Sequence, residues 1–302
     1  VCVAAGRERS AIVCQSPYEA VGALAFRTVI PERWRPRVQV EIHGDWRTAT
    51  RLCGGVHRHW LSHVSDGMAA WAVRNADRVR VVSTWLARLA RETGSRGAIE
   101  SHIAFSDYTP FYATPPGPLP PRPHVLFAGV LERYKGVDVL VDSWPEVLES
   151  VPDALLTIIG AGTQEAQLRA QIERLGIGTT VTMAPRLPRS EIREMLDASW
   201  CLCLPSRSEG LGRIVLEAMA AGRAVVATRS GGPEELVIDH QSGRLVNMED
   251  TRALAAALVD VLGDRGLAEA MGAEGRRLAE NHDPLAEYEA GIERLSRWIV
   301  RG

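Results

Sequence analysis

Apolar residues along the chain alternate between two arrangements. Short apolar runs, such as residues 200–204, are followed by stretches in which apolar residues recur every three or four positions, such as residues 212–222. The first arrangement is typical of buried strands, and the second is typical of helices that bury one face. Because the two alternate through most of the sequence, we predict an α/β protein with parallel, doubly wound sheets.

The first 109 residues predict four strands and three helices, after a weak strand-like segment at residues 1–10. The expected strands are residues 11–15, 37–43, 78–83 and 98–104, and the expected helices are residues 17–27, 56–75 and 84–91, the last capped by Thr84. A strand–helix–strand unit takes roughly 30 residues or more. This part therefore holds only about three such units.

A proline-rich segment divides the chain. Residues 110–123 contain seven prolines, which favour a stiff, extended linker. The part that follows predicts strands at residues 125–129, 154–160, 179–184, 200–204, 224–228 and 244–246, and helices at residues 136–149, 163–175, 190–198, 212–222, 250–262 and 264–280. A last helix is expected over residues 284–301.

The most informative stretch is residues 206–222. Gly210 and Gly212 allow a tight turn between the preceding apolar run and the expected helix. A strand, a glycine-containing turn and a helix N-terminus form an anion site, because free N–H groups and the helix dipole face the ligand. Glu209 and Glu217 lie close to this site, where carboxylates suit sugar or ribose hydroxyls better than phosphate.

Three motifs together resemble a known enzyme family. Glu209 and Glu217, with seven residues between them, resemble the paired-glutamate motif of retaining glycosyltransferases of family 4, which have the two-domain GT-B fold. The segment 129–136, which ends in Lys135-Gly136, and the segment Gly-Gly-Pro-Glu-Glu at 231–235 also stand where that family has them. The resemblance covers residues 124 to about 250.

The resemblance implies two Rossmann-like domains. The expected parts are an N-terminal acceptor-side domain (1–109), the linker (110–123), a nucleotide-sugar-binding domain (124–283) and a helix (284–302) that crosses back to the first domain. Family members begin with a strand and a Gly-rich loop, which this sequence does not show. The N-terminal domain is therefore either truly reduced or incomplete, and we expect that a front segment is missing.

The donor site of the family is carried over to residues of the second domain. Lys135 would bind donor phosphate, and Arg133 is the nearest substitute for an arginine that the family has where this sequence has Val130. The resemblance further assigns the distal phosphate to the backbone N–H groups of Gly210, Leu211 and Gly212, the ribose hydroxyls to Glu217, the donor sugar to Glu209, and the nucleotide base to the backbone around Arg186 and Leu187.

In the first domain, His43 ends an expected strand. It matches the histidine that family members direct at the donor sugar, which makes His43 and Glu209 the candidate catalytic residues. A histidine at a strand end can also simply bond to the backbone. Asp45, Trp46 and Arg47, which follow His43, are candidate acceptor contacts.

Metal chemistry is not indicated. His57, His59 and His63 resemble a metal cluster, but the sequence between the last two lacks the glutamate of a zinc-protease helix, so a polar helix face is the simpler interpretation. The sequence contains no Asp-x-Asp motif. We expect no metal and no cofactor, with a UDP- or GDP-sugar donor as the substrate.

Composition adds expectations about partners and compartment. A net charge of −2 with 24% charged residues gives no reason to expect nucleic acid. Residues 1–110 nevertheless hold fifteen arginines and no lysine against ten acidic residues, which indicates either a solvated surface or a face for anionic lipid or an acidic acceptor. Unpatterned cysteines in apolar runs (Cys14, Cys201, Cys203) favour a cytoplasmic protein, peripheral on a membrane if the cationic face binds lipid.

Three functions remain open at this point. The first is a retaining, metal-independent glycosyltransferase that moves a sugar to a hydroxyl of a glycan, a lipid-linked or a small-molecule acceptor. The second is a catalytically weak nucleotide-sugar-binding fragment or subunit that needs the missing N-terminal segment. The third is a nucleotide-sugar epimerase on the same fold, which the spacing of the paired glutamates disfavours.

Overall fold

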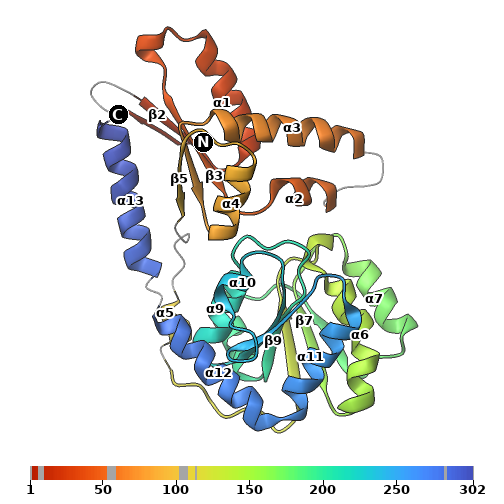
Figure 1. The fold of residues 1–302 in the computed structure, drawn as a ribbon. Coiled ribbons are helices and arrows are strands. Elements are labelled where there is room, and N and C mark those ends of the chain that lie inside the picture. Colours follow the sequence, from red (N-terminus) through yellow and green to blue (C-terminus); the bar gives the residue numbers. More distant parts are fainter. Residues whose placement is uncertain are drawn as a thin grey trace. The chain divides into compact units, whose positions relative to one another are not determined.

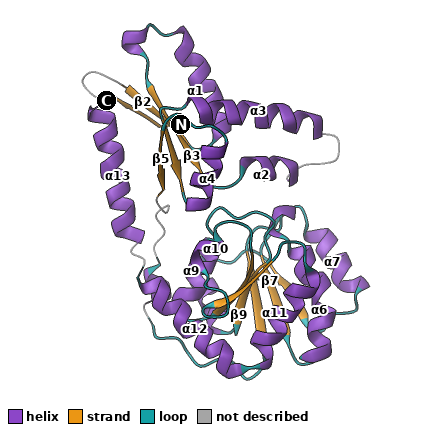
Figure 2. Ribbon diagram, in the orientation of Figure 1, coloured by secondary structure: helices purple, strands orange, loops and turns teal. Residues whose placement is uncertain are grey.

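The computed structural model describes residues 2–5, 10–52, 59–101, 108–112, 114–281 and 284–301. The chain divides into two compact units, of which the first comprises Val1–Ser106 with Asp283–Gly302 and the second comprises Asp107–His282. Each unit has its own β-sheet with helices packed against it (Figure 1 and Figure 2). The predicted α/β fold is therefore confirmed. None of the helices in the described ranges is long and apolar enough to cross a membrane.

The first unit has a five-stranded sheet in the order β1-β2-β3-β4-β5. The strands are β1 (Cys2–Ala5), β2 (Ser10–Cys14), β3 (Arg37–Ile42), β4 (Arg78–Val81) and β5 (Ala98–Ser101). β1 is antiparallel to β2, and the other neighbours are parallel. Apolar residues of β3 such as Val38 and Val40 alternate with Gln39 and Glu41, and all four are buried, so both faces of this strand are covered.

The helices of the first unit are α1 (Pro17–Val29), the 3₁₀ turn η1 (Glu32–Trp34), α2 (Trp46–Leu52), α3 (His59–Asn75), α4 (Thr84–Glu92) and α13 (Pro284–Arg301). The sequence pattern did not predict α2. Thr84 is not the cap of α4, because the side chain of Ser83 accepts the hydrogen bond from the Leu86 N–H at 3.3 Å. Arg37 donates to the Trp298 carbonyl of α13 at 2.7 Å, and its guanidinium lies 4.3 Å from the Trp298 ring.

The second unit has a six-stranded parallel sheet in the order β11-β10-β9-β6-β7-β8. The strands are β6 (His124–Ala128), β7 (Leu155–Ile159), β8 (Val181–Ala184), β9 (Cys201–Leu204), β10 (Ala224–Thr228) and β11 (Gly243–Val246). All residues of β9 and β10 are buried. Continuous apolar runs of this kind are typical of strands with helices on both faces.

The helices of the second unit connect these strands. They are α5 (Thr109–Tyr112), the 3₁₀ turn η3 (Arg133–Lys135), α6 (Val137–Ser150), α7 (Glu165–Arg174), α8 (Arg189–Asp197), α9 (Arg213–Ala220), α10 (Pro233–Leu236), α11 (Thr251–Gly263) and α12 (Arg265–Glu280). α11 packs on α6, and α12 packs on α9.

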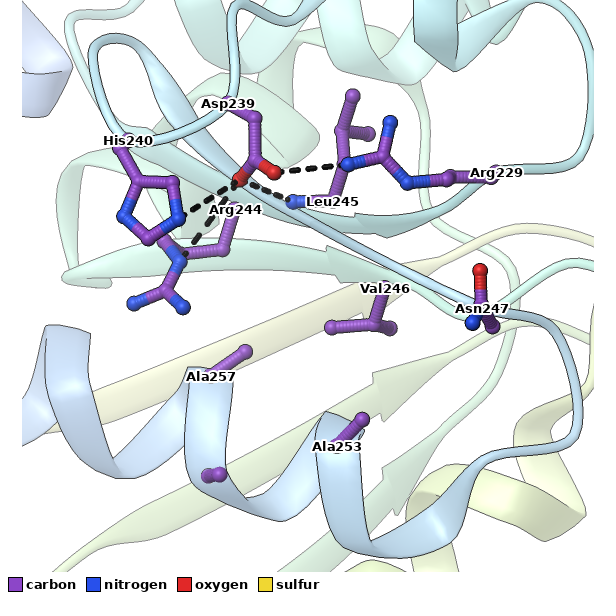
Figure 3. A pocket seen from close by; sticks show the side chains of 10 residues that line it. Arg229, Asp239, His240, Arg244, Leu245, Val246, Asn247, Ala253 and Ala257 are labelled. Carbon is purple, nitrogen blue, oxygen red and sulfur yellow. Dashed lines mark hydrogen bonds and ion pairs between the residues drawn. The ribbon is translucent and has the colours of Figure 1, made fainter.

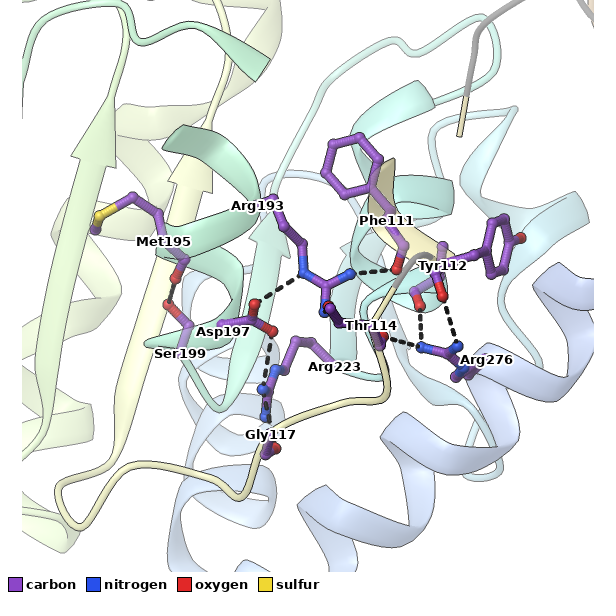
Figure 4. A network of polar contacts seen from close by, with 11 residues as sticks. Phe111, Tyr112, Thr114, Gly117, Arg193, Met195, Asp197, Ser199, Arg223 and Arg276 are labelled. Carbon is purple, nitrogen blue, oxygen red and sulfur yellow. Dashed lines mark hydrogen bonds and ion pairs between the residues drawn. The ribbon is translucent and has the colours of Figure 1, made fainter. Parts of the chain in front are cut away.

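The proline-rich segment is fastened to the second unit (Figure 4). Three arginine side chains bind its backbone and hydroxyl oxygens: Arg193 donates to Phe111 and Thr114, Arg276 to Tyr112 and Thr114, and Arg223 to Gly117. Asp197 accepts from Arg193 at 2.8 Å and from Arg223 at 3.3 Å. Pro110 lies in the single turn of α5, where the sequence had suggested extended chain.

Candidate active site

The strand order of the second unit reverses between β6 and β9. The chain runs from β6 outward to β8, returns to β9 on the other side of β6, and continues outward to β11. Loops that leave two neighbouring strands in opposite directions open a crevice at their carboxyl ends, which is where open α/β sheets bind ligands. The loops at this switch point are residues 129–136 after β6 and residues 205–212 after β9.

Two glycines shape these loops. Gly136 has φ = 66°, and a Cβ at this position would lie 2.0 Å from the Pro205 carbonyl oxygen, so only glycine lets the two loops touch. Gly212 has φ = 86° and precedes the first residue of α9. Within the described residues no side chain caps α9. The Val215 N–H donates to the Gly212 carbonyl at 2.8 Å, and the preceding N–H groups at the start of the helix can meet a ligand.

The lysine of one loop pairs with a glutamate of the other. Lys135 Nζ lies 2.5 Å from Glu209 Oε2, and both side chains are 14% exposed. Lys135 is the only lysine in the sequence. The ion pair thus joins the two loops of the switch point beside the N-terminus of α9. The Ser206 hydroxyl also donates to Glu209 Oε2, at 3.4 Å, whereas the other carboxylate oxygen has no partner among the described residues.

The glycine-rich segment after β10 holds Glu209 by its backbone. The Glu209 N–H donates to the Ser230 carbonyl at 3.0 Å, and the Gly232 N–H donates to the Glu209 carbonyl at 2.8 Å. The Gly-Gly-Pro-Glu segment identified in the sequence therefore fixes the position of one of the paired glutamates.

Glu217 lies in α9 and pairs with Arg189 at the start of α8. Arg189 donates to Glu217 Oε1 at 2.8 Å, and the Glu217 side chain is 11% exposed. Burial raises the pKa of Glu217 above its ordinary value, although Arg189 and Arg213 act in the opposite direction. Sequence reasoning missed Arg189, whose guanidinium also lies 5.2 Å from the Phe111 ring.

The remaining residues predicted for the donor site lie in loops at the carboxyl ends of the strands of the second sheet. Arg133 is exposed in η3, and its carbonyl accepts a hydrogen bond from Arg207, a second residue that the sequence did not suggest. Arg186 is exposed and Leu187 is half-buried in the loop between β8 and α8. The structure thus brings Lys135, Glu209, Gly210, Leu211 and Gly212 into the two switch-point loops, and the role of each stays a prediction.

In the first unit, His43 directly follows β3. His43 Nε2 lies 3.4 Å from Glu41 Oε2, and Arg80 contacts the same oxygen at 3.0 Å. Burial would raise the pKa of Glu41, but the hydrogen bonds and charges of His43 and Arg80 outweigh it and hold that pKa below its ordinary value. Glu41 therefore carries a negative charge beside the exposed imidazole.

The three residues proposed as acceptor contacts surround the start of α2. Asp45 accepts from the Arg47 N–H at 3.0 Å and from the Thr48 hydroxyl at 2.9 Å, which is the geometry of a helix cap. Trp46 is only 4% exposed. All three residues thus have structural contacts: the Arg47 side chain, although 42% exposed, donates to Asp45 Oδ1 at 3.2 Å and lies 5.8 Å from the Trp46 ring.

The histidines considered as metal ligands give no site in the parts of the chain that the structure describes. His57 lies outside the described residues, and nothing is described of the His59 side chain. His63 is exposed on α3. Among the described ranges, no group of three or more His, Cys, Asp or Glu side chains could hold a metal ion.

A cavity of about 380 Å³ lies elsewhere in the second unit, between β11 and α11 (Figure 3). Its central carboxylate, Asp239, accepts from Arg229 at 2.8 Å and from the Leu245 N–H at 3.0 Å, and Arg244 lies 3.8 Å away. None of the residues predicted from the motifs lines it. Its arginine charges are already balanced by carboxylates, so the switch point is the stronger candidate site.

Fold and site together define a class, the α/β proteins that bind a nucleotide or a similar ligand at the switch point of a parallel sheet. Comparison with known proteins narrows this class. Residues 116–278 match the model of the family Glycosyl transferases group 1, and the chain belongs to this family.

Relatives agree with this assignment. The chain is 32% identical over 252 residues to a GDP-mannose-dependent alpha-(1-6)-phosphatidylinositol monomannoside mannosyltransferase of Mycolicibacterium smegmatis, in an alignment that covers 76% of this chain and 66% of that protein. It is 30% identical over 238 residues to a glycogen synthase of Mycobacterium tuberculosis, covering 76% of this chain and 57% of that protein.

A solved structure shows the same fold. Sucrose-phosphate synthase from Thermosynechococcus elongatus superimposes with a TM-score of 0.78 at 22% identity, covering 95% of this chain and 73% of that one. The fold of this chain is accordingly that of GT-B glycosyltransferases. The alignments with curated relatives span 34% to 66% of those proteins.

Proposed function

We propose that the chain is a retaining, metal-independent glycosyltransferase of family 4, which moves a sugar from a nucleoside-diphosphate sugar to an acceptor hydroxyl. The observation that carries this proposal is the Lys135–Glu209 ion pair at the switch point, next to the uncapped N-terminus of α9. The dependence of the M. smegmatis relative on GDP-mannose supports a nucleotide-sugar donor.

Each part of the site suits one part of such a donor. The Lys135 ammonium and the amides at residues 210–212 would bind the diphosphate, whose negative charge they offset without a metal ion. Glu209 would accept a hydroxyl of the donor sugar, and Glu217 would accept the ribose hydroxyls. The loop after β8, with Arg186 and Leu187, would contact the base.

The reaction follows from this arrangement. The bond between the anomeric carbon and the phosphate oxygen breaks, and the acceptor oxygen forms a bond to the same carbon from the same face. The acceptor hydroxyl gives its proton to the leaving phosphate, and a nucleoside diphosphate is released. Positive groups around the diphosphate stabilise the charge that develops on this leaving group. His43 of the first unit would contact the donor sugar, with the charged Glu41 holding its ring.

We also propose that the first unit contacts an anionic membrane surface through the end of α1 and η1. Phe26, Val29 and Trp34 are 60%, 77% and 67% exposed. Residues 26–37 contain four arginines and one glutamate. Arg33, which lies 5.8 Å from the Trp34 ring, and Arg35 are exposed, whereas Arg27 pairs with Asp77 and Arg37 packs on Trp298. Exposed apolar and aromatic side chains among arginines are typical of segments that rest in the membrane interface.

Cys14, Cys201 and Cys203 are buried as free thiols, which supports a cytoplasmic location.

A thermal-shift screen of UDP-, GDP- and ADP-sugars, followed by a transfer assay, tests the proposed activity. A ligand that binds the folded chain raises its melting temperature, by an amount set by concentration and affinity. We expect one donor class to stabilise the wild type and to lose this effect in Lys135→Ala, whereas Arg229→Ala, in a cavity away from the switch point, should respond like the wild type.

The alternatives give different results. Donor binding without sugar transfer, with turnover restored by an added upstream segment, would identify a binding fragment. Conversion of the donor to its epimer without an acceptor would identify an epimerase, which family membership does not favour. Stabilisation by no nucleotide sugar at all would contradict the proposal.

A further inference from the structure

Arg207 is a charged side chain with many partners and no assigned role. It lies in the loop after β9, two residues before Glu209, and its side chain is only 12% exposed. Its backbone N–H donates to the Tyr134 carbonyl at 2.7 Å, and one guanidinium nitrogen donates to the Arg133 carbonyl at 2.5 Å. Arg207 therefore binds the backbone of the 3₁₀ turn η3, which carries Lys135.

The same guanidinium reaches two carboxylates. Both of its terminal nitrogens donate to Asp138, in the first turn of α6, at 2.7 Å each. It also donates to both oxygens of Glu249, just before α11. A planar fork that pairs two parallel N–H groups with a carboxylate fixes direction as well as distance.

Glu249 has an unusual backbone. Its φ is 61°, in the left-handed region that is unfavourable for a non-glycine residue. The hydrogen bonds that Glu249 makes to Arg207 are available to offset this cost. The turn before α11 thus contributes to the same network as the lysine turn.

The charge balance separates Arg207 from Lys135. Two carboxylates pair with Arg207, so its N–H groups have little capacity left for a phosphate. Among the described residues Lys135 pairs with one carboxylate, that of Glu209, and its ammonium also lies 5.3 Å from the Tyr134 ring. We propose that Arg207 is a positioning residue, which holds the Lys135 turn against the Glu209 loop so that a diphosphate meets the lysine in a fixed place. This inference rests on the proposed donor site.

The test compares Arg207→Lys and Arg207→Met with the matched control Arg229→Met. Arg229 follows the neighbouring strand β10, and its guanidinium pairs with the carboxylate of Asp239. Its described contacts do not include the turn η3 that carries Lys135. Affinities for a nucleoside diphosphate and the corresponding monophosphate are measured by calorimetry with UDP and UMP or with GDP and GMP. Melting temperatures are recorded for every variant.

We expect both Arg207 variants to bind the diphosphate about tenfold more weakly, a loss of about 1.4 kcal/mol, and the monophosphate within about twofold of the wild type. The control should bind both normally. Equal losses for the two nucleotides, or no loss in an Arg207 variant that stays folded, would overturn the inference. Failure of the wild type to bind any diphosphate would instead reject the proposed function.

A second measurement needs no nucleotide. Because Lys135 is the only lysine in the chain, an amine-selective acylating reagent followed by peptide mass spectrometry reports on this side chain. In Arg207→Met the loosened turn should expose Lys135 and increase its acylation rate severalfold, with no change in Arg229→Met. An unchanged rate would show that Arg207 does not hold the turn.

Discussion

Glu217→Gln is the substitution that separates binding of the ribose from binding of the diphosphate. Arg189 occupies Glu217 Oε1, and within the described residues no group bonds to Oε2, which leaves that oxygen for a ribose hydroxyl. A hydrogen bond to a charged group contributes about 1.5–3 kcal/mol. Glutamine keeps the shape but removes the charge, so we expect the affinity for a nucleoside diphosphate to fall about 10- to 150-fold.

The ligand supplies the control for this prediction. Calorimetry with the ribonucleotide and with its 2′,3′-dideoxy analogue, on wild type and Glu217→Gln, forms a double-mutant cycle between carboxylate and hydroxyls. The wild type should prefer the ribonucleotide, and this preference should be much smaller in the variant, whose amide makes only neutral hydrogen bonds. If the substitution weakens binding of the dideoxy nucleotide as much as binding of the ribonucleotide, Glu217 does not bind the ribose and the assignment is wrong.

Three further predictions concern stability and surface contact. Because the pKa of Glu217 is raised above its ordinary 4.5, the folded chain holds that proton more tightly than the unfolded chain, and stability is lost as the pH rises from 4.5 through the folded-state pKa. Glu217→Gln should therefore have a higher melting temperature than the wild type at neutral pH, and this difference should close below about pH 4.5. A difference in melting temperature that widens on acidification would contradict this prediction. Gly136→Ala should lower the free energy of unfolding more than Gly176→Ala, by a further ~1–3 kcal/mol. The two glycines have φ of 66° and 67°, but only at Gly136 would a Cβ meet backbone atoms. Equal losses in denaturant unfolding would refute the argument. Val29→Ser should reduce sedimentation with anionic phosphatidylglycerol vesicles about tenfold. The control Val300→Ser, at a position with the same 77% exposure, should sediment like the wild type. Equal behaviour of the two variants would contradict the membrane proposal.

Much of the second unit follows from its sequence because its signals are local. The buried strand β9, the turn at Gly210 and Gly212 and the helix α9 are contiguous, so periodicity and glycine placement were enough to locate them. The left-handed conformation of Gly222, with φ = 70°, also ends α9 where expected.

Contacts between distant segments left no such signal. Arg207 is 69 residues from Asp138 and 42 from Glu249, and nothing in the sequence around it marks it as more than one of many arginines. Arg189 and Glu217 are likewise 28 residues apart in the sequence, on the separate helices α8 and α9. The cap of α4 was misplaced by one residue because Ser83 and Thr84 have equivalent hydroxyls, and only the observed geometry distinguishes them.

The central claim is that the diphosphate of a nucleoside-diphosphate sugar binds between Lys135 and the N-terminus of α9. The most direct measurement is acylation of the single lysine at saturating UDP- or GDP-sugar, compared with the free nucleoside, with saturation shown by calorimetry. We predict that the nucleotide sugar protects Lys135 and the nucleoside does not. An unchanged acylation rate in the saturated complex would contradict the account and place the ligand elsewhere.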